Sequence, residues 1–427
     1  MVRVGNGLMR IGIIRSPMNL VTINIDSVRL GHPLPFTLRD VTGVMLASKG
    51  YVVRTRADLD QIVAQRGELY VDVAESESHH RAYMGKLHSL VREEHSLGKI
   101  ADARISVSDL DRHREIADND ESNWLDLQIQ AHGMLRDGNP ESFQARLDKL
   151  QVQLSRNAHL NPDGSLFALI HLSASDVRMY SATHAMLVSM ICRLAAREVL
   201  KWPADMEATL CNAALTMNIG MTELQDRLVV QREDPTPDQR RQIDEHAARS
   251  VRILAQLGID DPRWLEAVLH HHTKKPGPLA TRTDGQRMAR LIQRADMFAA
   301  RLAPRVARAR ESPAAGMQAS YFDENREIDE AGAALIKAVG IYSPGSFVRL
   351  TNNEIAVVVK RGANTTTPRV AILVNRAGMP TGELIVRDTS QPDYRIVTSV
   401  SHSDVKVKIN LERLLVLTKS PVSDRRW

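Results

Sequence analysis

Between residues 124 and 312, one segment after another carries apolar side chains at three- and four-residue spacing, as in "ESFQARLDKLQVQLSRN" and "VRMYSATHAMLVSMICRLAAREVLKW". This spacing is typical of amphipathic helices that bury one face. Further helices are predicted at about 205–218, 237–257, 262–273 and 285–306. A run of this length buries a sizeable core, so the sequence predicts an all-helical domain.

Residues that begin and end helices support these boundaries. Thr236, followed by Pro237 and Gln239, forms a capping box with proline at the first helical position. Gly220 and Gly258 lie where glycine commonly ends a helix. These residues therefore support the predicted helix boundaries at positions 220, 236 and 258, in addition to the apolar spacing within the helices.

The segments on both sides of the helical run are typical of β structure. Short β-branched stretches separated by glycine turns come first, followed by a short helix in "RADLDQIVAQRG". The predicted fold is mainly α: an all-helical bundle flanked by a small N-terminal β-rich module and a C-terminal β segment. Its parts are an extension or disordered stretch (1–18), the β-rich module (19–75), a linker helix region (76–123), the all-helical domain (124–342) and the β segment (343–427).

The composition excludes several classes of protein. The chain has 427 residues, 43% of them hydrophobic, as expected for a globular protein of two or three domains. No apolar run reaches the roughly 20 residues of a membrane helix, and the first residues lack the apolar core of a signal peptide. Cys192 and Cys211 are the only cysteines and lie in apolar helical segments. They indicate two buried thiols in a reducing compartment, so we expect a cytoplasmic protein without membrane contact.

The net charge of +5 leaves the class of partner open. Lysine and arginine are spread along the chain, and no basic block is interleaved with aromatic residues. A nucleic-acid partner is therefore the less favoured interpretation. A basic surface that attracts a phosphate-bearing small molecule fits the charge as well as nucleic-acid binding does, and a mildly basic surface with no role fits it better than either.

Several of the predicted helices place an imidazole or a carboxylate on an otherwise apolar face. These inward groups are His184, His246, His271, His272 and Asp296. Each needs a partner to offset its desolvation. Imidazoles with a carboxylate are the ligand set of Zn, Mn or Fe, whereas the alternative is a set of core residues satisfied by hydrogen bonds. Periodicity alone leaves open whether they converge in space.

The order of these residues resembles the HD-GYP branch of the HD-domain phosphohydrolases, bacterial enzymes that hydrolyse cyclic di-GMP. The segments that carry it are "YSATHAM", "TPDQRRQIDEHAARSVRIL", "LHHHTKKPG", "ADMFAARLAPR" and "VGIYSPGSFVRLTNNEIAVVV", with "IDSVRLG…GVMLASKGY" similar to a module that often precedes the domain. The resemblance spans about residues 20–360. It implies that the mainly α fold is built on an HD-domain-like helical bundle, with residues 124–342 an HD-GYP-like all-α domain, and that the inward groups are metal ligands.

The chain departs from the family where the family is most characteristic. The "HDIGK" segment aligns with residues 217–221, so Met217 and Asn218 replace the His-Asp pair and Met221 replaces the phosphate-binding lysine. Thr273 stands at the Glu of "HHE", and Ala299 at a second Asp. "TKKPGPLA" contains no GYP triplet.

These losses reduce the expected metal capacity. The resemblance implies that the missing Asp bridges two metals, whereas Asn218 offers a neutral carbonyl and Met217 a soft thioether. The remaining imidazoles and Asp296 suit one borderline ion better than two. We therefore expect either one divalent metal (Zn, Mn, Fe or Ni) or none, and Met217, on the stripe of Leu210 and Ala214, is most simply interpreted as a core residue.

Three functions follow as hypotheses. The favoured one is a catalytically impaired sensor or adaptor that binds cyclic di-GMP or a signalling protein, with phosphate contacts from Lys274, Lys275, Arg290 and Arg294. The second is a metal-dependent phosphodiesterase with a reduced site, in which Asp296 orients a water. The third is a basic nucleic-acid-binding regulator. The sequence leaves open the input signal of the N-terminal module and whether the chain forms a homodimer.

Overall fold

The computed structural model describes residues 124–419 except 176, 178, 303–311, 383–384, 406 and 408–410. Before residue 124 it describes 20–22, 30, 34, 37–42, 45–47, 51–53, 55–57, 60 and 68–72. The chain divides into two compact units, residues 1–126 and 127–427. Among the described residues, no helix has the length and apolar character needed to cross a membrane.

The first unit contains a small antiparallel sheet with the strand order β1-β4-β2-β3. Its strands are β1 (Leu20–Thr22), β2 (Leu38–Arg39), β3 (Met45–Ala47) and β4 (Tyr70–Asp72). Leu38 is fully buried and aligns with Val71 of β4. The predicted short helix is helical at the three positions described within it, 56, 57 and 60. The predicted extension and the predicted linker helix lie outside the described residues.

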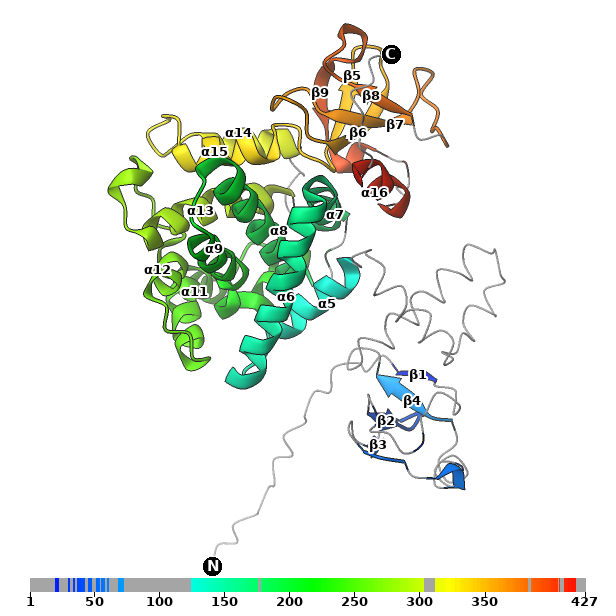
Figure 1. Ribbon diagram of the computed structural model, residues 1–427, viewed down its shortest axis with the longest axis vertical. Coiled ribbons are helices and arrows are strands. Elements are labelled where there is room, and N and C mark those ends of the chain that lie inside the picture. The colour runs from blue at the N-terminus through cyan, green and yellow to red at the C-terminus, as the bar shows by residue number, and fades with distance from the viewer. Residues whose placement is uncertain are drawn as a thin grey trace, which may run out of the picture. The chain divides into compact units, whose positions relative to one another are not determined.

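The second unit begins with the predicted helical bundle, and the mainly α fold class is confirmed (Figure 1). Its α-helices are α5 (Trp124–Met134), α6 (Pro140–Leu160), α7 (Pro162–Ser175), α8 (Tyr180–Leu194), α9 (Ala204–Thr216), α10 (Thr222–Val230), α11 (Pro237–Gln256), α12 (Pro262–His270), α13 (Asp284–Leu302), α14 (Pro313–Tyr321) and α15 (Glu330–Val339). A π-helix, η2 (Ala195–Leu200), continues α8, and the 3-10 turns η3 (Ile219–Met221) and η4 (Leu279–Thr281) follow α9 and α12.

Helix α8 is the centre of the bundle. All of its residues are buried, and it packs against α7, α9, α10 and α13. A helix that is covered on every side has no face toward solvent. Its polar side chains, including His184, therefore need hydrogen-bond partners inside the protein. Cys192 of α8 and Cys211 of α9 are both buried and free, as predicted.

The predicted helix ends are partly confirmed. Thr236 and Gln239 form both bonds of the capping box at the start of α11, and Gly258 ends α11 with a φ of 84°. Gly220 does not end a helix, because α9 ends at Thr216 and Gly220 lies within η3. A Cβ at Gly220 would lie 2.8 Å from the backbone nitrogen of Ser250. Close approach to α11, rather than helix termination, therefore requires glycine there.

The C-terminal part forms a five-stranded antiparallel sheet with the order β8-β7-β6-β5-β9. The strands are β5 (Phe347–Leu350), β6 (Ile355–Lys360), β7 (Arg369–Val374), β8 (Val386–Asp388) and β9 (Ile396–Val400). A final helix, α16 (Leu411–Lys419), which the sequence pattern did not predict, packs with α7 against β6. Phe167 of α7 and Leu414 of α16 join the buried cluster on that face of the sheet.

Candidate metal centre

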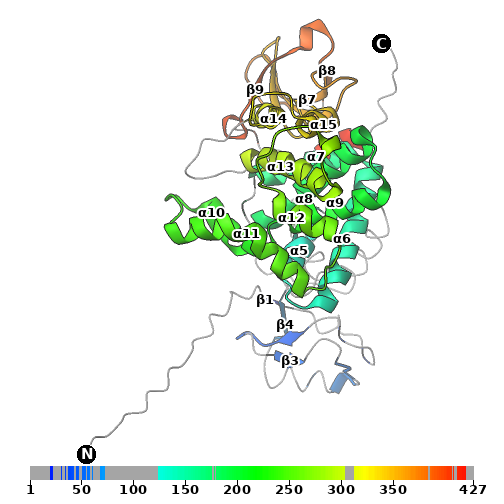
Figure 2. The same ribbon diagram turned by 90° about the vertical axis from the view of Figure 1, so that its left-hand side faces the viewer.

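Three histidines from two helices converge in the second unit. They are His246 of α11 and His271 and His272 at the end of α12, and one ring nitrogen from each lies within 4.8 Å of the others. His246 and His271 are buried, whereas His272 is exposed. Figure 2 shows α11 beside α12, and α12 beside α13, in the bundle. The convergence that periodicity left open is therefore present for these three imidazoles.

The early end of α12 allows two consecutive histidines to face the same neighbour. Asp261 caps the start of α12 and Pro262 occupies its first turn. The helix was predicted to reach residue 273 but ends at His270, and the Thr273 N–H bonds the His270 carbonyl in a turn. Consecutive residues of a continuing helix would diverge by about 100° around its axis. Leaving the helix brings both His271 and His272 toward His246.

The backbone fixes the protonation of two of these rings. Nδ1 of His246 bonds the Ile243 carbonyl, and Nδ1 of His271 bonds the Val268 carbonyl at 2.6 Å. A carbonyl only accepts, so we assign the proton of each neutral ring to Nδ1. The two Nε2 atoms, which then carry lone pairs, lie 3.1 Å apart. Two imidazole nitrogens bound to one tetrahedral Zn²⁺ at about 2.0–2.1 Å lie about 3.3 Å apart, so this spacing suits a shared cation.

A proton is a poor alternative to a metal between these rings. Burial lowers the pKa of His271 to about 3, with the neighbouring His272 and His246 acting in the same direction. Burial also lowers the pKa of His246. Near neutral pH both rings are therefore neutral, which is the state in which imidazole binds a metal.

His184 and Asp296 form a separate pair next to the three histidines. His184 Nε2 lies 2.7 Å from Asp296 Oδ1, and His184 Nδ1 lies 3.3 Å from the Tyr180 hydroxyl. Burial raises the pKa of Asp296, but the hydrogen bond from His184 and the electrostatic effects of His184, His272 and His271 together outweigh it, so the pKa lies well below its ordinary value. The charge of Asp296 also acts on His246 and His271. Of the five predicted ligands, three thus form one cluster and two pair with each other beside it.

The positions of the missing His-Asp pair lie at the end of α9. Met217 is fully buried, as a core residue would be, and Met221 is partly exposed. Asn218 is buried, and its Oδ1 has no hydrogen-bond partner among the residues that the structure describes. Buried polar atoms are nearly always paired. The orphaned amide oxygen is therefore consistent with a site that accepts a further group.

The turn that follows Asn218 lies directly against the helix of His246. The Gly220 N–H donates to Ser250 Oγ at 3.0 Å, and a Cβ on Gly220 would lie 2.9 Å from the His246 carbonyl. The residues present therefore fit one borderline dication held by three imidazoles. They do not supply the bridging carboxylate of a two-metal site.

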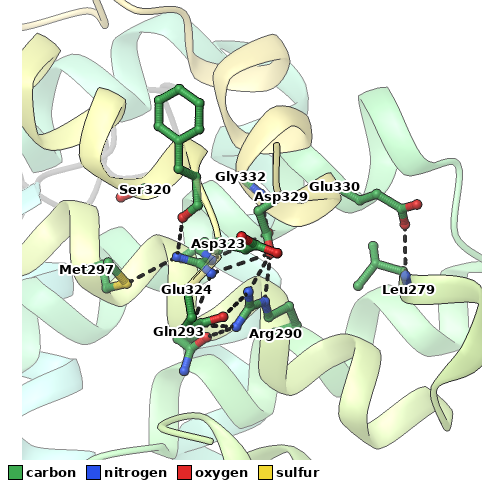
Figure 3. Close-up of polar contacts among 12 residues, drawn as sticks. Leu279, Arg290, Gln293, Met297, Ser320, Asp323, Glu324, Asp329, Glu330 and Gly332 are labelled. Carbon is green, nitrogen blue, oxygen red and sulfur yellow. Dashed lines mark hydrogen bonds and ion pairs between the residues drawn. The ribbon is translucent and has the colours of Figure 1, made fainter. Parts of the chain in front are cut away.

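The predicted phosphate contacts divide into two kinds. Lys274 and Lys275 are exposed. Arg290 and Arg294 are buried and bond protein groups: Arg290 bonds Asp329 at 2.8 Å and Glu324 at 2.9 Å, and Arg294 bonds the Phe322 carbonyl at 3.0 Å (Figure 3). Their guanidinium groups thus tie α13 to the hairpin between α14 and α15. A phosphate-binding role stays a prediction for the two lysines.

The sequence analysis missed a glutamine that supports the histidine turn. Gln293 Nε2 donates to the Thr273 carbonyl at 3.1 Å, and its Oε1 accepts from Arg290 Nη1 at 2.6 Å. Gln293 and Arg290 lie three residues apart on α13, as labelled in Figure 3. That spacing is readable from the sequence, but the partner of Gln293 is twenty residues away and has no local signal.

Comparisons with protein-family models and with curated proteins found no match. Among solved structures, the chain matches Bd1817, described as an HDG"Y"P protein, from Bdellovibrio bacteriovorus. The two chains are 12% identical, and the match covers 74% of this chain and 98% of that chain with a TM-score of 0.36. Similarity at this level does not assign the chain to a family.

Proposed function

We propose that the helical bundle is a degenerate HD-GYP-type domain that holds one divalent metal and serves as a catalytically impaired sensor or adaptor in cyclic di-GMP signalling. The observation that supports it most is the 3.1 Å separation of the His246 and His271 Nε2 atoms, both in the lone-pair state. The motif resemblance supports the link to cyclic di-GMP. A bound ion would supply a Lewis-acid site for an oxygen of an anionic ligand.

The charges of the site favour one ion rather than two. Two dications about 3.5–4 Å apart repel each other and need bridging carboxylates. The structure places Met217 and Asn218 on the turn beside α11, where neither side chain carries charge. Asp296 is the carboxylate beside the cluster, and one of its oxygens already binds His184.

A second candidate function is residual phosphodiester hydrolysis. The pKa of Asp296 lies below its ordinary value because His184, His272 and His271 together outweigh the effect of burial. The carboxylate is therefore ionised at neutral pH and can accept a hydrogen bond from a water. The chain of Tyr180, His184 and Asp296 resembles a relay that orients such a group.

One metal-quantified preparation tests both candidates. We expect about one Zn²⁺ or Ni²⁺ per chain after loading and desalting, falling to near zero in His271→Ala but not in His270→Ala, which alters a histidine outside the cluster. The same preparation is then assayed for cyclic di-GMP binding and hydrolysis. Binding without turnover supports the sensor, fast turnover supports the phosphodiesterase, and metal content below about 0.1 per chain contradicts both.

A further inference from the structure

A small pocket adjoins the histidine turn on the side of α13. It has a volume of about 180 Å³, and its lining includes His270, Thr273, Lys275, Arg282 and Gln286. Pockets that enclose a whole drug-sized ligand measure roughly 300–1,000 Å³. This pocket therefore suits a single small group rather than an entire dinucleotide.

The charge of the pocket is positive. Lys275 and Arg282 line it, and no carboxylate is among its lining residues in the described part of the chain. Arg290 also lines it, but Glu324 and Asp329 neutralise that charge. Two cations therefore remain without a matching acid in the lining.

Arg282 is held in a position that leaves part of its guanidinium group unused. Its Nη2 donates to the carbonyls of Lys275 and Gly277, which fixes it against the 275–277 loop. Its Nε is buried and has no hydrogen-bond partner among the described residues. A buried donor without an acceptor is unfavourable, and arginine pairs best with an oxyanion that takes two parallel N–H groups.

Gln286 of the lining is already bound to a glutamate, Glu266, which is not among the lining residues. Gln286 Nε2 donates to Glu266 Oε1 at 3.0 Å, and Thr283 donates to Glu266 Oε2 at 2.8 Å. Both carboxylate oxygens of Glu266 therefore already accept hydrogen bonds from residues at the start of α13. The Thr273 hydroxyl is a neutral polar group of the lining. It lies 3.2 Å from His270 Nδ1, and Thr273 follows His272 directly in the chain.

We propose that this pocket binds a phosphate monoester or free phosphate, independently of the metal. The identification of the ligand as part of a nucleotide rests on the proposed function, whereas the anion preference rests on Lys275 and Arg282 alone. His270 precedes the metal-binding pair and Thr273 follows it in the chain. A phosphate group in the pocket therefore lies beside the histidine turn without being a ligand of the cluster.

Calorimetric titration of the chelator-treated full chain with inorganic phosphate at fixed ionic strength tests the pocket. We expect roughly tenfold weaker binding in Arg282→Gln and in Lys275→Ala, since each loses a charged hydrogen bond. Lys337→Ala is the matched control, because Lys337 is also exposed, does not line the pocket and has no predicted phosphate role. If Arg282→Gln unfolds, the exposed Lys275 still supplies the test.

Absence of phosphate binding by the chelated wild type, or an equal loss in Lys337→Ala, would overturn the inference. Binding that requires added metal would also overturn it, since the metal would then be the anion site. A lack of metal binding contradicts the proposed function but leaves the pocket intact, so the two failures differ. Titration with GMP distinguishes the source: tighter binding than inorganic phosphate assigns a nucleotide, and equal binding assigns free phosphate.

Discussion

Asn218 carries a neutral amide where a two-metal site would need a carboxylate, and the two side chains differ only by an amide nitrogen in place of an oxygen. Its side chain is buried, its Oδ1 is unpaired among the described residues, and the next turn contacts α11 at His246. Replacing the amide by a carboxylate would add a charge without adding volume. Whether that charge is tolerated depends on a cation nearby, which makes the substitution a probe of the metal.

We expect Asn218→Asp to destabilise the chelated protein by about 1–3 kcal/mol and to raise its metal affinity. A buried carboxylate without a partner is costly, whereas a metal offsets the charge. Thermal unfolding with and without chelator measures both effects. Asn212→Asp, a change at a partly exposed position of α9 six residues before Asn218, is the control and should show neither. Equal destabilisation with and without metal would place Asn218 away from the ion.

Gly220 tests the close approach of the same turn to α11. An added Cβ would lie 2.8 Å from the Ser250 nitrogen and 2.9 Å from the His246 carbonyl, both backbone atoms that cannot turn aside. We expect Gly220→Ala to lower the free energy of unfolding by about 1–3 kcal/mol and to weaken metal binding. Urea denaturation checks the first effect, and Gly138→Ala, where nothing lies within 4 Å, should have little effect.

At the scale of elements, α13 connects the hairpin between α14 and α15 to the histidine turn. Glu324 and Asp329 hold Arg290, Arg290 holds Gln293, and Gln293 holds the Thr273 carbonyl. Figure 3 shows the part of this chain of bonds that joins Glu324 and Asp329 to Arg290 and Gln293. The last bond, from Gln293, reaches the residue after His272. A hydrogen-bond partner behind a metal-binding segment sets the position of its ligands.

We expect Gln293→Leu to weaken metal binding by about tenfold or more, because partners of this kind typically contribute 10–100-fold to affinity. Ser320→Ala removes another buried bond of the same region, to the Gly316 carbonyl, and serves as the control. Both variants should lose stability, but metal affinity should fall only in Gln293→Leu. Parallel losses of affinity in the two variants would show a general loosening rather than positioning.

The sequence predicts those features of the elements that depend on neighbours in the chain. The capping box at Thr236 and the inward placement of His246 follow from spacing alone, and both are observed. The end of α12 at His270 was missed because residues 271–273 continue an acceptable helical pattern. The pairing of His184 with Asp296 joins residues 112 apart, so no local pattern encodes it.

At the scale of the whole molecule, the metal should act on only one of the two compact units. The three histidines all lie in residues 127–427, whereas the sheet of β1 to β4 belongs to residues 1–126. Units with separate cores need not unfold in one transition. A ligand that binds only the folded state stabilises the unit that binds it by mass action.

We therefore expect calorimetry of the full chain to show a transition that rises with metal concentration and a second signal that does not. At a free metal concentration 100 times the Kd, the stabilisation is about 2.7 kcal/mol, which corresponds to a rise in Tm of roughly 4 °C for a unit as long as residues 127–427. His271→Ala should abolish the rise, and His270→Ala should retain it. A metal-dependent rise that persists in His271→Ala would place the ion at residues other than the three-histidine cluster.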